Sequence, residues 1–181
     1  MKQSFVFSGS GGQGIMSAGI TLAHTAIDMG KHSTFLPEYG PEQRGGSAKC
    51  TVIISDGDII SPLPKKCDNL IAMNEQAYSK FIDDVKEGGT VVVNSSRVTD
   101  IERQDVTTIS VPVDDVALEL GNEKVANTVI IGALIGATGI VSKDAVIASL
   151  EEKFKEKSPK IMELNIAALE KGITLGKGAA E

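Results

Sequence analysis

A glycine-rich turn near the beginning of the chain places the strongest constraint on the fold. Residues 9–14 read Gly-Ser-Gly-Gly-Gln-Gly and follow a short, largely apolar run at residues 4–8. Beyond the turn, apolar side chains recur at three- and four-residue spacing as far as Met29, a pattern typical of a helix, and Gly30 supplies a stop. Strand, glycine-rich turn and helix in this order form the opening of a βαβ unit.

The alternation of strands and helices continues along the chain. Pro37 is expected to break the second strand, and a helix over residues 75–85 is expected to close at Gly88 and Gly89. Further strands are predicted at residues 32–36, 48–55, 69–73, 90–94 and 107–113. A chain of 181 residues can bury one core. We therefore predict a single domain over residues 1–181 with an α/β fold: three layers, with a Rossmann-like, mostly parallel sheet and helices on both faces.

The last third begins with an almost unbroken apolar stretch at residues 125–141. A transmembrane helix needs about 20 such residues, so this stretch predicts a buried helix and no membrane span. Four small residues in it let another backbone approach closely, which favours burial in a subunit contact: Gly132, Ala133, Gly136 and Ala137. Two more helices are expected, one capped by Ser142 and one that begins at Ser158 and Pro159 and ends at Gly172.

Charge and cysteine content exclude several classes of function. The chain carries 18 Lys and Arg against 24 Asp and Glu, a formal charge of −6, and only 4% aromatic residues. Nucleic acid is therefore not an expected partner. Cys50 and Cys67 form neither a CxxC motif nor a His/Cys cluster, so no metal or iron–sulfur site is predicted in this chain. No signal peptide is recognised, which indicates a cytoplasmic, reducing compartment.

The glycine-rich turn has the spacing of a phosphate-binding loop, because Gly9, Gly11 and Gly14 match G-x-G-x-x-G between a strand and a helix. Such a loop brings backbone close to a diphosphate, at the positively polarised start of the helix. The predicted cofactor-binding residues are Gly9, Ser10, Gly11, Gly12, Gln13 and Gly14. A turn that merely packs the helix on the sheet is the alternative. An NAD-type site also needs an acid about 20 residues on, for which Glu38 is the candidate.

A second distinctive loop reads Pro-Glu-Tyr-Gly-Pro-Glu-Gln-Arg-Gly-Gly at residues 37–46. Two glycines follow Arg44 and leave its guanidinium accessible, which suits bidentate recognition of a carboxylate or phosphate. The other interpretation is a surface turn in which Arg44 pairs with Glu42 or Glu38.

Taken together, the two loops give the chain a family resemblance. Gly-Ser-Gly-Gly-Gln-Gly followed by Glu-Tyr-Gly-Pro-Glu-Gln-Arg-Gly-Gly-Ser resembles the gamma subunit of 2-oxoacid:ferredoxin oxidoreductases. The similarity covers almost the whole chain and extends to Gly121-Asn122, Val125-Ala126-Asn127, Asn165, Ala168-Leu169 and Gly172. The run at residues 41–46 favours the 2-oxoglutarate branch over pyruvate or branched-chain acids.

The resemblance implies an indirect role in a multi-subunit oxidoreductase. These enzymes decarboxylate a 2-oxoacid on thiamine diphosphate, pass electrons through iron–sulfur clusters to ferredoxin, and release an acyl-coenzyme A. Thiamine diphosphate and the clusters are expected on the alpha, beta and delta-type partner subunits. This chain is expected to contribute a gamma-type domain, coenzyme A contacts and assembly surfaces, and no catalytic residue of its own.

The residues expected to face partner subunits or an anionic substrate group are Tyr39, Gly40, Glu42, Arg44, Gly45, Gly46 and Asn127. Asn127 is polar within an apolar helix and is expected to cap it or to hydrogen-bond across an interface. His24 and His32 are interpreted as structural, and Asp56-Gly57-Asp58 as a turn. Two alternatives remain: a stand-alone nucleotide- or coenzyme-A-binding module, and a self-sufficient NAD- or flavin-type oxidoreductase.

Overall fold

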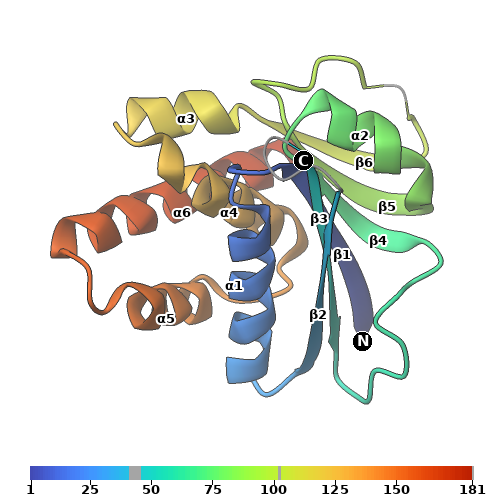
Figure 1. Cartoon of the computed structure of the whole chain (residues 1–181), viewed down its shortest axis with the longest axis horizontal. Helices are drawn as coiled ribbons and strands as arrows, with labels where there is room; N and C mark the ends of the chain where they lie inside the picture. The colour runs from blue at the N-terminus through green and yellow to red at the C-terminus, as the bar shows by residue number, and fades with distance from the viewer. Residues whose placement is uncertain (41–45, 102, 181) are drawn as a thin grey trace.

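The computed structural model describes residues 1–40, 46–101 and 103–180, and its fold is α/β (Figure 1). Six strands are present in this part of the chain: β1 (Lys2–Ser10), β2 (His32–Tyr39), β3 (Ser47–Ser55), β4 (Cys67–Ala72), β5 (Val85–Asn94) and β6 (Thr107–Val111). The helices are α1 (Ile15–Asp28), α2 (Glu75–Phe81), α3 (Val113–Glu119), α4 (Ala126–Thr138), α5 (Lys143–Phe154) and α6 (Pro159–Ala180), with short 3-10 turns η1 (Ile82–Asp84) and η2 (Glu123–Val125).

The six strands form one mixed sheet in the order β2-β3-β1-β4-β5-β6. Strands β1, β4, β5 and β6 run parallel to one another, while β3 lies antiparallel between β1 and β2. The carboxyl ends of the four parallel strands therefore meet at one edge, where α/β proteins commonly bind ligands.

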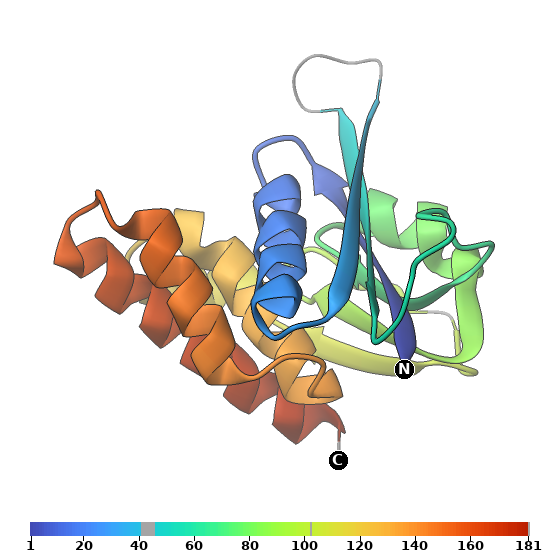
Figure 2. The same cartoon turned by 90° about the horizontal axis from the view of Figure 1, so that it is seen from below.

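Helices cover both faces of the sheet, as the alternation of elements predicts (Figure 2). On one face α1, α4 and α6 pack on alternate strand residues such as Phe5, Phe7 and Ile71. On the other face α2 packs through Tyr78 against the intervening residues, among them Leu70. The period-2 alternation of the strands thus divides the core into two layers. The three-layer prediction is confirmed.

Residues that were expected to interrupt the regular structure lie inside strands. Pro37 is part of β2 and stands opposite Cys50, which is possible because β2 is an edge strand with no partner for the missing N–H on its outer side. Gly88 and Gly89 belong to β5, which begins as early as Val85. The pairing of β5 with β4 shifts register there, and Gly88 has a φ of 73°, so the glycines form an irregularity within the strand.

The apolar helix α4 packs on α6 of the same chain, where the sequence suggested a subunit contact. A Cβ atom on Gly132 would lie 2.3 Å from the carbonyl oxygen of Leu169, and one on Gly136 would lie 2.4 Å from that of Ile173. Gly172, expected to end the last helix, lies inside α6. It packs closely against α4, since a Cβ on Gly172 would lie 2.1 Å from the Val129 carbonyl oxygen. The small residues serve helix packing within the chain.

Other boundaries at this end were predicted correctly. The side chain of Ser142 accepts a hydrogen bond from the Ala145 N–H at 3.2 Å and caps α5, and α6 begins at Pro159. Among the described residues, no helix combines the length and apolar character that crossing a bilayer requires.

Candidate functional site

The glycine-rich turn presents open backbone at the start of α1. Gly12 and Gly14 have φ angles of 96° and 74°, which glycine adopts without strain. Gly14 occupies the N-cap position of α1, no side chain caps the helix, and its first turn contains no acidic residue. The first hydrogen bond of the helix runs from Ala18 N to Gly14 O at 2.9 Å. The amides before Ala18 therefore point toward the turn and suit an anion.

Side chains from a neighbouring strand end hold the turn in place. Gln13 Oε1 accepts hydrogen bonds from Ser10 N at 2.7 Å and from Asn74 Nδ2 at 2.9 Å. Gln13 Nε2 donates to Met73 O at 3.2 Å, and Asn74 Nδ2 also contacts Ser10 Oγ at 2.9 Å. These polar groups of Gln13 and Ser10 are thus engaged within the protein and fix the shape of the turn.

The first two glycines of the motif make contacts within the protein. A Cβ on Gly9 would lie 2.6 Å from Gln13 Oε1, so the turn closes tightly over β1. Gly11 N donates to Gly46 O at 3.0 Å. Gly9 thus has a packing role, Gly11 joins the turn to the residue before β3, and Gly12 and Gly14 line a cavity.

That cavity has a volume of about 310 Å³ and lies beyond the carboxyl ends of the four parallel strands. Its walls come from the glycine-rich turn, from the residues that follow β4, β5 and β6, and from the start of α4. The lining residues are Gly12, Gln13, Gly14, Met73, Arg97, Asp114, Asp115, Leu118, Glu123, Lys124, Ala126 and Asn127.

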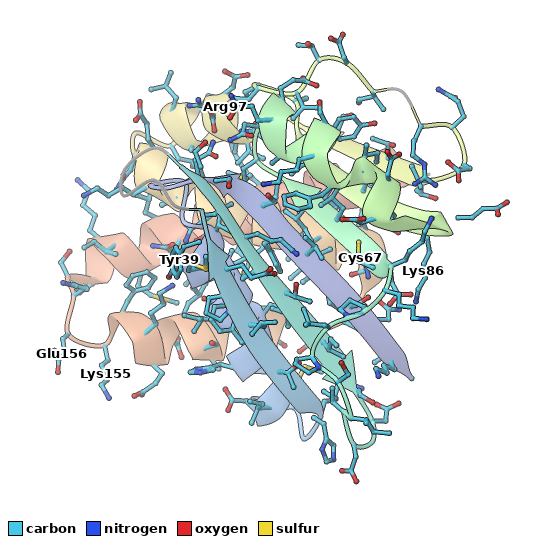
Figure 3. The ribbon with its side chains drawn as sticks, turned by 45° about the vertical axis from the view of Figure 1, so that its right-hand side comes forward. Tyr39, Cys67, Lys86, Arg97, Lys155 and Glu156 are labelled. Carbon is cyan, nitrogen blue, oxygen red and sulfur yellow. The ribbon has the colours of Figure 1, made fainter. Side chains whose placement is uncertain are left out.

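A charged network forms the part of the cavity wall that comes from the residue segments after β5 and β6. Arg97 lies beside α3 (Figure 3), and its Nε contacts a carboxylate oxygen of Asp114 in the first turn of that helix. Asn94 Nδ2 donates to the other oxygen of Asp114 at 2.9 Å, while its own Oδ1 accepts from Val113 N at 3.1 Å. Asp115 Oδ2 accepts from Ser96 Oγ at 3.0 Å. This wall therefore carries both signs of charge and is braced by the fully buried Asn94.

Asn127, at the start of α4, contacts the glycine-rich turn and the first turn of α1. Its Nδ2 donates to Ser17 Oγ at 3.2 Å. A Cβ on Gly14 would lie only 2.8 Å from the Asn127 Cβ, so glycine is needed there. The N-cap position of α4 is Val125, and Asn127 therefore does not cap the helix. Its described contacts lie within the chain.

The second loop is described only at its two ends. Tyr39 ends β2 with 73% of its surface exposed, and Gly40 N donates to Ser47 O at 2.9 Å. Gly46 is buried against Gly11. Figure 2 shows that β2 and β3 reach beyond the rest of the sheet at this point. The predicted site residues Glu42, Arg44 and Gly45 lie outside the described residues.

Glu38 does not fit the role of an acid that holds a ribose. Its carboxylate pairs with Lys49 Nζ at 2.9 Å across the β2–β3 pair. It is not part of the cavity lining. The NAD-type interpretation therefore lacks its acidic residue.

The remaining candidates lie away from the cavity. His24 is exposed on α1, and His32 Nδ1 lies 3.7 Å from a carboxylate oxygen of Asp58. Both thiols are free, and burial raises the pKa of Cys50 to about 12 and that of Cys67 to about 11. In the described part of the chain, no group of three His, Cys, Asp or Glu side chains is arranged to hold a metal ion.

Eight of the twelve residues that line the cavity were not predicted as site residues. Asp114 and Asp115 escaped prediction because residues 107–113 were expected to form a strand, whereas β6 ends at Val111 and Pro112 leads into α3. Arg97, which follows β5, and Lys124, in η2, were not predicted either. A usable signal was present: polar residues directly end or follow the apolar strands, as Asn74 and Asn94 do. In a parallel sheet such positions meet at one edge.

Comparison with known proteins gives one consistent family. Residues 4–175 match the family Pyruvate ferredoxin/flavodoxin oxidoreductase. The 2-oxoglutarate synthase subunit KorC of Methanocaldococcus jannaschii is 40% identical, with 98% of this chain and 95% of that protein covered. The ketoisovalerate oxidoreductase subunit VorA of Methanothermobacter marburgensis is 36% identical over 91% of this chain, which spans only 34% of the length of VorA.

Solved structures of related oxidoreductases have the same fold as this chain. The keto/oxoacid ferredoxin oxidoreductase gamma subunit of Geobacter sulfurreducens superposes with a TM-score of 0.87 at 35% identity, covering 99% of this chain and 98% of that one. The 2-oxoglutarate:ferredoxin oxidoreductase of Magnetococcus marinus, a structure with 2-oxoglutarate, coenzyme A and succinyl-CoA bound, has a TM-score of 0.92. At 24% identity, and with 31% of that chain covered against 98% of this one, it shows the shared fold.

Proposed function

Since the chain belongs to the Pyruvate ferredoxin/flavodoxin oxidoreductase family and has the length and fold of its gamma subunit, we propose that it works within a 2-oxoacid:ferredoxin oxidoreductase complex. That complex decarboxylates a 2-oxoacid oxidatively, yielding an acyl-coenzyme A, carbon dioxide and reduced ferredoxin. Thiamine diphosphate and the iron–sulfur clusters belong to the alpha, beta and delta-type partner subunits.

The proposed substrate is 2-oxoglutarate. KorC subunits of 2-oxoglutarate synthases match this chain over nearly their whole length at 36–40% identity in three methanogens. The pyruvate synthase subunit PorC of Methanothermobacter thermautotrophicus is 31% identical over 83% of the chain. The full-length similarity therefore favours the 2-oxoglutarate branch.

The role of this chain is to bind part of coenzyme A, and the observation that carries this proposal is the uncapped start of α1 opening into the cavity. The free amides near Gly12 and Gly14 suit the diphosphate of coenzyme A. Lys124 lines the same cavity without an ion pair to any described residue and adds a positive charge. Glu123, on the same wall, offers a carboxylate to hydroxyl or amino groups of the nucleotide.

Calorimetry on the isolated chain tests this role directly. Coenzyme A is expected to bind, and pantetheine, which lacks the diphosphate and nucleotide, to bind at least about tenfold more weakly. Lys124→Ala is expected to weaken coenzyme A binding about three- to tenfold. Lys171→Ala is the matched control, because Lys171 pairs with Glu119 outside the cavity. Equal binding of the two compounds would rule out the diphosphate site.

The place of the chain in a complex is tested by anaerobic purification from its native cells. A tagged chain is expected to recover larger subunits and coenzyme-A-dependent reduction of a low-potential dye with 2-oxoglutarate. Arg44→Ala is expected to reduce assembly or turnover, since Arg44 is proposed to face a partner or an anionic substrate group. Recovery of the chain alone, with coenzyme A bound, would instead support a stand-alone binding module.

A further inference from the structure

One cation in the cavity wall leaves the outer edge of its guanidinium group free. Arg97 follows β5, lines the cavity and is exposed beside α3 (Figure 3). Its Nε contacts Asp114 Oδ2, and this is the only hydrogen bond that its side chain makes with a described residue. The terminal nitrogens Nη1 and Nη2 are therefore available to a ligand in the cavity.

A carboxylate and a buried amide hold this guanidinium group in position. Asp114, in the first turn of α3, contacts Arg97 through one oxygen and accepts from Asn94 Nδ2 at 2.9 Å through the other. Asn94 is fully buried, and its Oδ1 accepts from Val113 N at 3.1 Å and from Ser96 N at 3.2 Å. Because the amide is fixed by these bonds, the carboxylate has little freedom to move. Asn94 and Asp114 are thus positioning residues for Arg97.

The same amide connects Arg97 to the glycine-rich turn. Asn94 Nδ2 also donates to Met73 O at 3.3 Å, and Gln13 Nε2 donates to that same carbonyl oxygen at 3.2 Å. From Asn94 the hydrogen bonds continue through Asp114 to Arg97. One connected network therefore fixes the separation of two groups that suit anions: the open amides of the turn and the guanidinium group.

The two groups suit the two anionic parts of coenzyme A. The amides near Gly12 and Gly14 lie at a helix start, which favours the diphosphate. A guanidinium group with both terminal nitrogens free forms two parallel hydrogen bonds to a phosphate group. Coenzyme A carries its diphosphate and its 3′-phosphate on one ribose, so a single molecule presents both anions at a limited separation.

The carboxylates of the cavity restrict where the second anion can bind. Asp114, Asp115 and Glu123 line the cavity, so a phosphate placed against them would meet negative charge. The ion pair of Arg97 with Asp114 uses Nε, and the terminal N–H groups remain as donors. Asp115 Oδ2 already accepts from Ser96 Oγ at 3.0 Å. The free edge of Arg97 is therefore the part of this wall that favours a dianion.

We infer that Arg97 is a specificity-determining residue of the cavity, which binds the 3′-phosphate of coenzyme A while the diphosphate lies against the glycine-rich turn. The inference rests on the proposed function for the binding of coenzyme A in this cavity. It adds that the chain distinguishes coenzyme A from dephospho-coenzyme A, which carries a hydroxyl group in place of that phosphate. A hydroxyl group does not accept the two parallel, charge-assisted hydrogen bonds.

Calorimetry on the full chain with these two compounds tests the inference. Dephospho-coenzyme A is expected to bind at least about tenfold more weakly than coenzyme A, because the bidentate pair is lost. Arg97→Gln is expected to weaken coenzyme A about tenfold and dephospho-coenzyme A less than about twofold, so that the preference disappears. Arg97→Lys keeps the charge without the planar fork and is expected to retain a preference of about threefold.

Lys86→Gln is the matched control. Lys86 pairs with Asp68 outside the cavity and lies well apart from Arg97 (Figure 3). Its side chain is 51% exposed, against 55% for Arg97, so the two substitutions each remove one half-exposed, ion-paired cation. The preference for coenzyme A is expected to be unchanged in Lys86→Gln. Circular dichroism verifies the fold of each variant.

The outcomes separate this inference from the proposed function. Equal binding of coenzyme A and dephospho-coenzyme A by the native chain overturns the role of Arg97 and leaves the coenzyme A cavity in place. An equal loss of both compounds in a folded Arg97→Gln variant does the same. Failure of the native chain to bind either compound overturns the proposed function, and this inference with it.

Discussion

Gly11 donates its backbone N–H to the carbonyl oxygen of Gly46 at 3.0 Å, so two glycine-rich segments that are 35 residues apart meet directly. Gly11 belongs to the turn before α1, and Gly46 leads into β3. Gly46 is therefore tied to the turn that opens into the cavity. The glycine-rich turn and the described C-terminal end of the second loop are thus joined directly.

Gln13→Ala is expected to destabilise the glycine-rich turn, because the Gln13 amide makes three hydrogen bonds, one with Ser10 N and two with the residues that follow β4, Met73 and Asn74. We expect a loss of about 1–3 kcal/mol in the free energy of unfolding by urea. Amide exchange at residues 10–14 is expected to quicken. Gln76→Ala, an exposed site on α2, is the control and is expected to change stability by less than about 0.5 kcal/mol.

Gly172→Ala is expected to force α4 and α6 apart. A Cβ at this position would lie 2.1 Å from the backbone oxygen of Val129, which only a helix shift can relieve. We expect a cost of about 3 kcal/mol in thermal or urea unfolding. Gly178→Ala in the same helix meets nothing within 4 Å, and the better helix propensity of alanine is worth up to about 1 kcal/mol there. Equal effects at the two sites would contradict the close packing.

The two native thiols are expected to resist alkylation at about pH 8. Burial raises the pKa of Cys50 to about 12 and that of Cys67 to about 11, so almost no reactive thiolate is present in the folded chain. Ellman's reagent should detect both thiols only after guanidinium is added. A Ser61→Cys variant, on the exposed loop before β4, supplies a thiol that reacts at once in the folded protein. Fast reaction of Cys50 in the native state would be inconsistent with its burial.

Asp56 is expected to titrate well below an ordinary aspartate. Hydrogen bonds from Lys31 at 2.8 Å and from the Met1 amine at 2.7 Å lower its pKa from 3.8 to about 2. Because the pKa is depressed, the stabilisation is present above about pH 4 and is lost as the pH falls toward 2. NMR titration of the carboxyl carbon measures the midpoint. Lys31→Met should raise it toward 3.8, and Lys160→Met should leave it unchanged.

Local sequence signals predicted the elements whose cause is local. The turn at residues 9–14 and the Ser142 cap appear where glycine φ preferences and side-chain capping require them. The predictions that Pro37 would break a strand and that Gly88 would end a helix were wrong for non-local reasons. Pro37 is tolerated because β2 has no outer neighbour, and Gly88 because β5 shifts its register against β4. Strand order and register arise from pairing between distant segments, which a local pattern does not contain.

The candidate site likewise contains residues that a local pattern predicts and residues that only the fold brings together. The glycine-rich turn was recognisable because a positive φ and a helix start leave a residue signature. Asp114 and Arg97 carry no such signature, since they reach the cavity only through the parallel arrangement of β5 and β6. Asn127 was noticed for its polarity, but its partner Ser17 lies 110 residues away and could be assigned only from the fold.

In the proposed complex, the packing of α4 against α6 bears on the order of assembly. The most apolar helix of the chain already has its complement before any other subunit arrives. The gamma-type chain is therefore suited to fold first and dock afterwards as a finished body. If the proposed partners were lost, α4 would stay covered by α6 of the same chain.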